Sequence, residues 1–126
     1  MLVLKHGGLS LRQTLKSKRS MPIRNVFAIL EQMCEGLGQL HRCDIIHNDL
    51  STGNVLVDPS GAVALCDLGN AIVHRAGWQG IWTPSLLRAQ GLQEITLWYR
   101  APEVLLGLAN YGLSVDIWSA GCIFGE

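Results

Sequence analysis

Apolar side chains recur at three- and four-residue steps between residues 22 and 41, which is the spacing of one helix face. Pro22 suits the first helical position, so the pattern predicts a long amphipathic helix with one buried face. The expected buried positions are Ile23, Val26, Phe27, Leu30, Met33, Cys34, Leu37, Leu40 and His41.

Shorter patterns before this helix predict two further elements. The apolar run 2–4 is typical of a strand that ends in a glycine turn. Ser10 lies three residues before Gln13, which is the spacing of a capping box, and this predicts a short helix over roughly 11–18.

The second half of the chain alternates between short patterns and a long irregular stretch. Residues 69–95 carry no sustained periodicity and predict a long loop. The other patterns predict short β pieces at 45–46, 55–57 and 62–66, a turn at 58–61, and helices over 102–106 and 113–126.

Composition narrows the functional classes. Ten basic and ten acidic side chains cancel, which argues against a nucleic-acid or membrane-surface partner. The four cysteines form no CxxC pair and no cluster with zinc spacing, and this favours a reducing, intracellular compartment, cytoplasm or nucleus. No apolar stretch reaches the length of a membrane span, so we expect no membrane partner.

Two motifs carry polar residues suited to phosphate chemistry. Residues 47–54 read HNDLSTGN, and DLG begins thirteen residues after Asn54. Phosphoryl transfer mainly needs a carboxylate that orients the attacking hydroxyl and oxygen ligands for magnesium, and Asp49, Asn54 and Asp67 offer that set. Each motif alone is weak, because an isolated DLG is usually a turn and a lone histidine beside a strand is usually a core residue.

Further matches in the expected order strengthen the signal. Residues 96–107 read TLWYRAPEVLLG and residues 115–126 read VDIWSAGCIFGE. With the HNDLSTGN loop, these strings resemble a eukaryotic protein kinase of the cyclin-dependent branch, while DLGNA is similar to the SR-protein kinases. The resemblance implies an α+β fold: the mainly helical large lobe with short β pieces around the catalytic loop. Residues 1–126 would run from the hinge to the helix after Ala-Pro-Glu.

The resemblance also assigns roles in a reaction that uses ATP and Mg²⁺. It implies that Asp49 is the catalytic carboxylate, that Asn54 and Asp67 bind magnesium, and that Leu56 lies under the adenine. Protein substrates are the implied partners, and a cyclin-like or other regulatory subunit is a candidate partner.

Scaffold roles follow from the same resemblance. Lys5 and His6 would belong to the hinge whose backbone meets adenine. His47 and Leu68 would belong to the packed spine behind the site, and Asp116 would brace the backbone of the catalytic loop.

Several positions depart from the family pattern. Ser51 replaces the catalytic-loop lysine, and loss of one such electrostatic stabiliser typically costs ~2.7–4 kcal/mol of barrier. Tyrosine kinases also lack that lysine, yet Thr96 favours Ser/Thr specificity. Asn48 and Ile72 replace two arginines and Gly91 replaces the phosphorylated threonine, so we expect no phosphorylation switch at that position.

Three functional hypotheses are compatible with these motifs. The leading one is ATP-dependent Ser/Thr protein phosphorylation, with a preference for proline after the hydroxyl because of Arg100. The residues given include no glycine-rich loop and no strand lysine, so the chain alone is expected to bind ATP poorly. The alternatives are a pseudokinase that acts as a regulatory binding module and a truncated, nonfunctional product.

Overall fold

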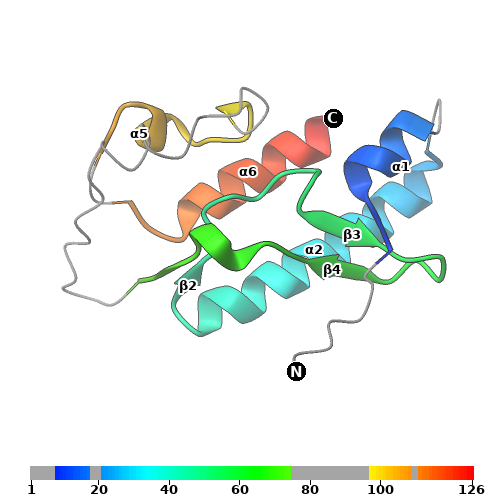
Figure 1. The fold of residues 1–126 in the computed structure, drawn as a ribbon, viewed down its shortest axis with the longest axis horizontal. Helices are drawn as coiled ribbons and strands as arrows, with labels where there is room; N and C mark the ends of the chain where they lie inside the picture. Colours follow the sequence, from blue (N-terminus) through cyan, green and yellow to red (C-terminus); the bar gives the residue numbers. More distant parts are fainter. Residues whose placement is uncertain (1–7, 18–20, 75–96, 109–110) are drawn as a thin grey trace.

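The computed structural model describes residues 8–17, 21–74, 97–108 and 111–126. They form four helices and five short strands, which confirms the expected α+β class (Figure 1). The helices are α1 (Leu11–Ser17), α2 (Ile23–Arg42), α5 (Pro102–Leu105) and α6 (Ser114–Gly125), with a 3-10 helix at Leu68–Asn70. The strands are β1 (Leu9–Ser10), β2 (Ile45–Ile46), β3 (Val55–Val57), β4 (Val63–Leu65) and β5 (Ile72–Val73).

The larger sheet is antiparallel, with strand order β1-β3-β4. Its central strand pairs Leu56 with Ser10 on one side and with Ala64 on the other. Gly8 enters β1 with φ +92°, and a Cβ there would lie 2.3 Å from the Val57 carbonyl oxygen. Only glycine fits this approach of the two backbones.

The turn between β3 and β4 is closed by one carboxylate. Asp58 Oδ1 accepts hydrogen bonds from the amide and hydroxyl of Ser60 and from the amide of Ala62. These bonds, that of the Ser60 side chain first, lower the pKa of Asp58. The turn expected at 58–61 is confirmed.

Helix α2 packs on β4 and β2, and α6 lies beside it (Figure 1). The side chains of α2 that are fully buried are Ile29, Met33 and Leu37. The long helix is therefore confirmed, but part of its expected buried face is wrong: Ile23 and Phe27 are 65% and 57% exposed, and Cys34 is exposed. Phe27 lies outside the core and places its ring 6.5 Å from that of Phe124 on α6.

The capping box before α1 is confirmed, because Gln13 N donates to Ser10 Oγ and Ser10 N donates to Gln13 Oε1. Pro22 is the N-cap of α2, one residue before the position expected for it. Within the described ranges, no helix is both long and apolar enough to cross a membrane.

The loop expected over 69–95 is wrong at its start. Residues Ile72–Val73 form β5, which pairs antiparallel with β2 in the register Ile45 to Val73 and Ile46 to Ile72. This pairing joins Ile72 to Ile46, which lies 26 residues earlier, and a local pattern does not reveal such a partner. The strand expected at 2–4 lies outside the described residues, as do residues 75–96 of the loop.

Candidate active site

The loop 47–54 lies between β2 and β3, and a buried carboxylate on α6 holds its first turn. Asp116 is 1% exposed and accepts three hydrogen bonds. Its Oδ2 accepts from His47 N and from His41 Nε2, both at 2.8 Å, and its Oδ1 accepts from Asn48 N at 2.9 Å. The expected bracing role of Asp116 is confirmed, while the contribution of His41 was not foreseen.

The imidazole of His47 ties this loop to the end of β4. The ring is fully buried, its Nε2 donates to the carbonyl oxygen of Cys66 at 3.1 Å, and its Nδ1 accepts from Asp49 N at 3.4 Å. The buried position expected for His47 is confirmed. That expected for Leu68 is wrong, because this side chain is 48% exposed on the 3-10 helix that follows the left-handed Asp67.

Backbone and amide contacts bring Asp49, Asn54 and Asp67 to one place. Asn54 Nδ2 donates to the Asp49 carbonyl oxygen at 2.7 Å, and Cys66 N donates to the Asn54 carbonyl oxygen at 3.0 Å. Asp67 follows directly with φ +62°, a left-handed conformation that aspartate tolerates better than most residues. Its exposed carboxylate accepts from Gly69 N at 3.4 Å.

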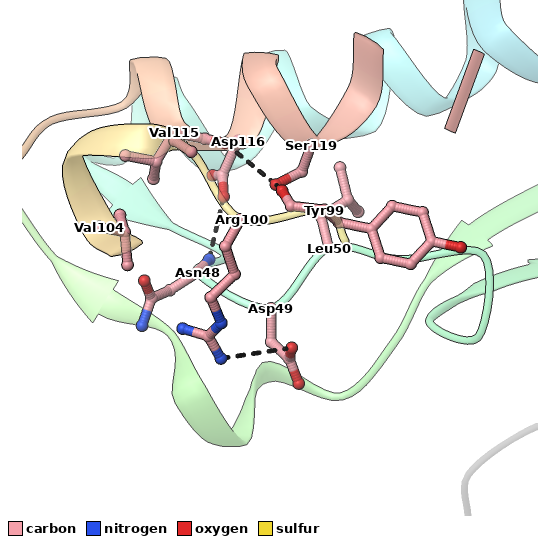
Figure 2. Close-up of a pocket in the computed structure, with 10 residues that line it drawn as sticks. Asn48, Asp49, Leu50, Tyr99, Arg100, Val104, Val115, Asp116 and Ser119 are labelled. Carbon is pink, nitrogen blue, oxygen red and sulfur yellow. Dashed lines mark hydrogen bonds and ion pairs between the residues drawn. The ribbon is translucent and has the colours of Figure 1, made fainter. Parts of the chain in front are cut away.

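The Asp49 carboxylate borders a small pocket between the catalytic loop, the segment 99–101 and α6 (Figure 2). Arg100 Nη2 lies 3.9 Å from Asp49 Oδ1, and Asn70 Nδ2 donates to Asp49 Oδ2 at 3.2 Å. Asp49 Oδ1 and Arg100 Nε are both buried, and neither has a hydrogen-bond partner among the described residues. Within that part of the chain, the site combines one carboxylate oxygen held by a donor with one that has none.

Ser51 is 6% exposed, and its hydroxyl accepts from Gly53 N at 3.3 Å. Its role inside the loop is thus to close a turn. A cation reaches the same turn from α1: a Cβ added at Gly53 would lie 3.4 Å from Cζ and Nη2 of Arg12 and 3.4 Å from Ser51 Oγ. The Arg12 backbone is fixed there, because its N donates to the Thr52 carbonyl oxygen at 2.9 Å.

Asn48 is held by neutral partners on both sides of its amide. Its Nδ2 donates to the Asn70 carbonyl oxygen at 3.1 Å, and its Oδ1 accepts from the Tyr111 hydroxyl at 3.0 Å. Burial raises the pKa of Tyr111 above its ordinary value. Ile72 packs against a cluster of buried apolar residues, so it has an apolar structural role. The cluster consists of Ile46, Ala101, Val104 and Val115.

The donor set suits magnesium better than a softer metal. Asn54 and Asp67 offer an amide and a carboxylate oxygen, and Mg²⁺ typically takes one or two protein oxygens with the rest from water and phosphate. Across the ranges that the structure describes, no group of three His, Cys, Asp or Glu side chains could hold a metal on its own.

Of the remaining expected site residues, the structure describes Leu56 alone. Leu56 is half-buried in the middle of the three-stranded sheet, just after the loop. Lys5, His6, Thr96 and Gly91 lie outside the described residues.

Comparison with known proteins gives one family. A family model described as "Protein kinase domain" matches residues 1–126. The chain is 34% identical over 119 residues to the probable serine/threonine-protein kinase MRK1 homolog of Encephalitozoon cuniculi, covering 94% of this chain and 34% of that protein. It is 39% identical over 116 residues to mitogen-activated protein kinase 7 of Arabidopsis thaliana, covering 92% and 29%.

A third relative is the meiotic mRNA stability protein kinase SSN3 of Saccharomyces cerevisiae, 39% identical over 109 residues, covering 86% of this chain and 19% of that protein. The chain thus spans about a third or less of the length of these curated relatives.

Proposed function

The chain belongs to the protein kinase domain family, and from this premise we propose that the protein transfers the γ-phosphate of ATP to Ser or Thr hydroxyls of protein substrates. The observation that carries the proposal is the junction of the two motifs. The side-chain amide of Asn54 donates to the Asp49 carbonyl oxygen, and its backbone carbonyl oxygen accepts from Cys66 N, so one asparagine joins the catalytic loop to the residue before Asp67.

Each residue has a defined task in this proposal. Asp49 Oδ1 accepts no hydrogen bond from the described residues, and in this proposal it accepts the proton of the substrate hydroxyl and aims that oxygen at the phosphate. Asn54 and Asp67 hold magnesium when the nucleotide is bound, and the ion offsets the charge of the phosphates. Leu56 lies under the adenine, with Lys5 and His6 as hinge residues and Thr96 beside the reacting hydroxyl.

The same proposal places residues 1–126 in the large lobe of the kinase, from the hinge to the helix after Ala-Pro-Glu. We assign the protein to the cyclin-dependent-like branch, on the strings TLWYRAPEVLLG and VDIWSAGCIFGE. A cyclin-like or other regulatory subunit is the candidate partner that this branch implies.

Substrate choice is proposed to depend on Arg100. Its guanidinium lies 3.9 Å from Asp49 Oδ1, so it borders the position of the substrate hydroxyl. We expect a preference for proline directly after the phosphorylated residue, as its place in the WYRAPE string implies. A peptide array without proline bias would remove this part of the proposal.

The experiment for the main proposal is a transfer assay on the full-length protein with radiolabelled ATP, magnesium and a library of Ser/Thr peptides. Labelled phosphoserine or phosphothreonine is the expected product, and it should be absent from the Asp49→Asn variant. The pseudokinase alternative rests on Ser51 and Asn48, and it predicts binding of nucleotide and magnesium without any transfer.

A further inference from the structure

A series of hydrogen bonds through neutral groups ends on the carboxylate of Asp49. The Tyr111 hydroxyl donates to Asn48 Oδ1 at 3.0 Å, Asn48 Nδ2 donates to the Asn70 carbonyl oxygen at 3.1 Å, and Asn70 Nδ2 donates to Asp49 Oδ2 at 3.2 Å. The four residues come from three separate parts of the chain, namely the catalytic loop, the 3-10 helix after β4 and the segment before α6.

The last bond separates the two oxygens of Asp49. Oδ2 is held by the Asn70 amide, whereas Oδ1 is buried, has no hydrogen-bond donor among the described residues and has Arg100 Nη2 at 3.9 Å. A carboxylate with one bonded oxygen cannot rotate freely about χ2, so the unbonded oxygen keeps a fixed direction.

The geometry points to Asn70, Asn48 and Tyr111 as positioning residues that hold Asp49 in its reactive orientation. This inference rests on the proposed function, because it assigns to the three residues the task of aiming the catalytic carboxylate. They act through Asp49 and need no contact with the substrate.

Asparagine is chemically suited to position 48. It donates through Nδ2 and accepts through Oδ1 at the same time, while its backbone N donates to Asp116 and its φ is +65°. Arginine has no acceptor for the Tyr111 hydroxyl, so an arginine here would end the series at its second member. Asparagine also tolerates a left-handed backbone better than most residues.

The kinetic test uses the full-length protein and single substitutions along the series. Asn70→Ala should lower kcat by about tenfold to hundredfold, because a hydrogen bond to a charged group is lost, with little change in KM for ATP. Asn48→Asp keeps the acceptor for Tyr111 and removes the donor to Asn70, and should lower kcat by about tenfold or less. Tyr111→Phe should lower kcat by about threefold.

Two further variants separate positioning from simple structural support. Asn70→Gln retains a donor and should recover part of the kcat that Asn70→Ala loses. Asn25→Ala changes an exposed asparagine on α2 and should leave kcat unchanged. Equal kcat for the parent and Asn70→Ala would overturn the inference. An Asn70→Ala variant whose KM for ATP rises by the same factor as its kcat falls would also overturn it.

A readout without catalysis keeps this inference distinct from the proposed function. In NMR spectra of the ¹⁵N-labelled protein, the side-chain amide of Asn70 should exchange slowly, and Asp49→Ala should shift its resonances. Tyr111→Phe should shift the side-chain amide of Asn48. If the parent transfers no phosphate, the proposed function fails, and these resonances still decide whether the series holds Asp49. Fast exchange of the Asn70 amide, unaffected by Asp49→Ala, would overturn it.

Discussion

The two sides of the catalytic loop differ in how their polar groups are satisfied. On the side that faces α6 and α2, Asp116 accepts three hydrogen bonds and the His47 ring uses both of its nitrogens. On the side where Asp49 meets Arg100 at the edge of the pocket, Asp49 Oδ1 and Arg100 Nε are buried and have no hydrogen-bond partner within the part of the chain that the structure describes. Buried polar groups are nearly always paired, so such exceptions call for a functional explanation.

This contrast indicates a division of labour within one loop. The side packed on α6 fixes the backbone, and the pocket side retains unsatisfied groups that a ligand can complete. A loop whose polar groups lacked hydrogen-bond partners on both sides would lose its conformation. A loop whose polar groups were all hydrogen-bonded within the protein would leave no oxygen for chemistry. Substitutions on each side should separate these two tasks.

Removing the charge on the pocket side should have the largest effect. In the full-length protein, Asp49→Asn should lower kcat by about 10²–10⁴-fold, because the amide cannot accept the proton of the substrate hydroxyl. Nucleotide affinity should be nearly unchanged, since the side chain of Asp49 lies outside the proposed nucleotide contacts. Steady-state kinetics and calorimetry would measure the two quantities.

A matched control is Asp44→Asn, which changes an exposed aspartate with φ +56° to a residue that also tolerates this conformation. This variant should behave like the parent. Equal turnover of Asp49→Asn and the parent would remove Asp49 from the catalytic role.

On the side packed against α6, the carboxylate of Asp116 is the group whose loss should matter most for folding. Asp116→Ala leaves the buried amide of His47 and the partly buried amide of Asn48 without this acceptor, so the free energy of unfolding should fall by about 3–5 kcal/mol. Asp116→Asn should lose less, because an amide oxygen still accepts one of these bonds. Urea titration followed by circular dichroism would measure both. A loss below about 1 kcal/mol for Asp116→Ala would contradict the bracing role.

These two sides were not equally predictable from sequence. The loop and its place between two β pieces follow from ordered motifs with fixed spacing, and the bracing by Asp116 follows from the family resemblance that these motifs carry. Ser10 and Gln13 identify a cap because both partners are local. The bonds of Asn70 to Asp49 and of Tyr111 to Asn48 span 21 and 63 residues. No local pattern indicates such contacts, and the one signal in the sequence was an asparagine within each of the strings HNDLSTGN and DLGNA.

The apolar pattern was informative about helices but less so about their buried faces. Periodicity placed α2 within one residue, yet it assigned Ile23 and Phe27 to the core and omitted Ile29, which is 7% exposed. Which apolar residues of a helix are buried depends on the elements packed against it, here β4, β2 and α6. The sequence positions of those partners do not specify their orientation.

A positive charge added to the catalytic loop should have a smaller effect. Ser51→Lys in the full-length protein should raise kcat by about tenfold or more, since one electrostatic stabiliser is typically worth about 10²–10³-fold. The expected gain is below the typical value because Arg12 already brings a cation to this turn. The gain should appear in kcat more than in KM, because the charge acts on the transition state. Ser51 is 6% exposed, so the lysine must direct its ammonium group outward along a flexible stem.

Ser17→Lys is the matched control for this change, because it adds the same charge at an exposed serine in the last turn of α1, where a cation is tolerated. It should leave kcat unchanged. An unchanged kcat in Ser51→Lys would mean that the cation of Arg12 already supplies the charge that the loop needs. Arg12→Gln should then lower kcat.

The smallest expected effect concerns Tyr99, whose hydroxyl joins the loop to the end of α6. It hydrogen-bonds to the buried Thr52 hydroxyl at 2.9 Å and donates to Glu126 Oε2. Burial, followed by the hydrogen bond to Glu126, raises the pKa of Tyr99. Because the folded state retains the phenol proton at higher pH than the unfolded state, this stabilisation is complete below about pH 10 and is lost as pH rises further.

Tyr99→Phe should therefore lower the free energy of unfolding by about 1 kcal/mol at pH 7 and should weaken its decline above about pH 10. Tyr111, the second of the two tyrosines, also has a raised pKa, so Tyr111→Phe is the matched variant and the double variant should decline least. Urea titrations at pH 7 and in the alkaline range would measure these differences. If Tyr99→Phe and the parent declined in parallel, the Tyr99 hydroxyl would contribute nothing to the junction between the loop and α6.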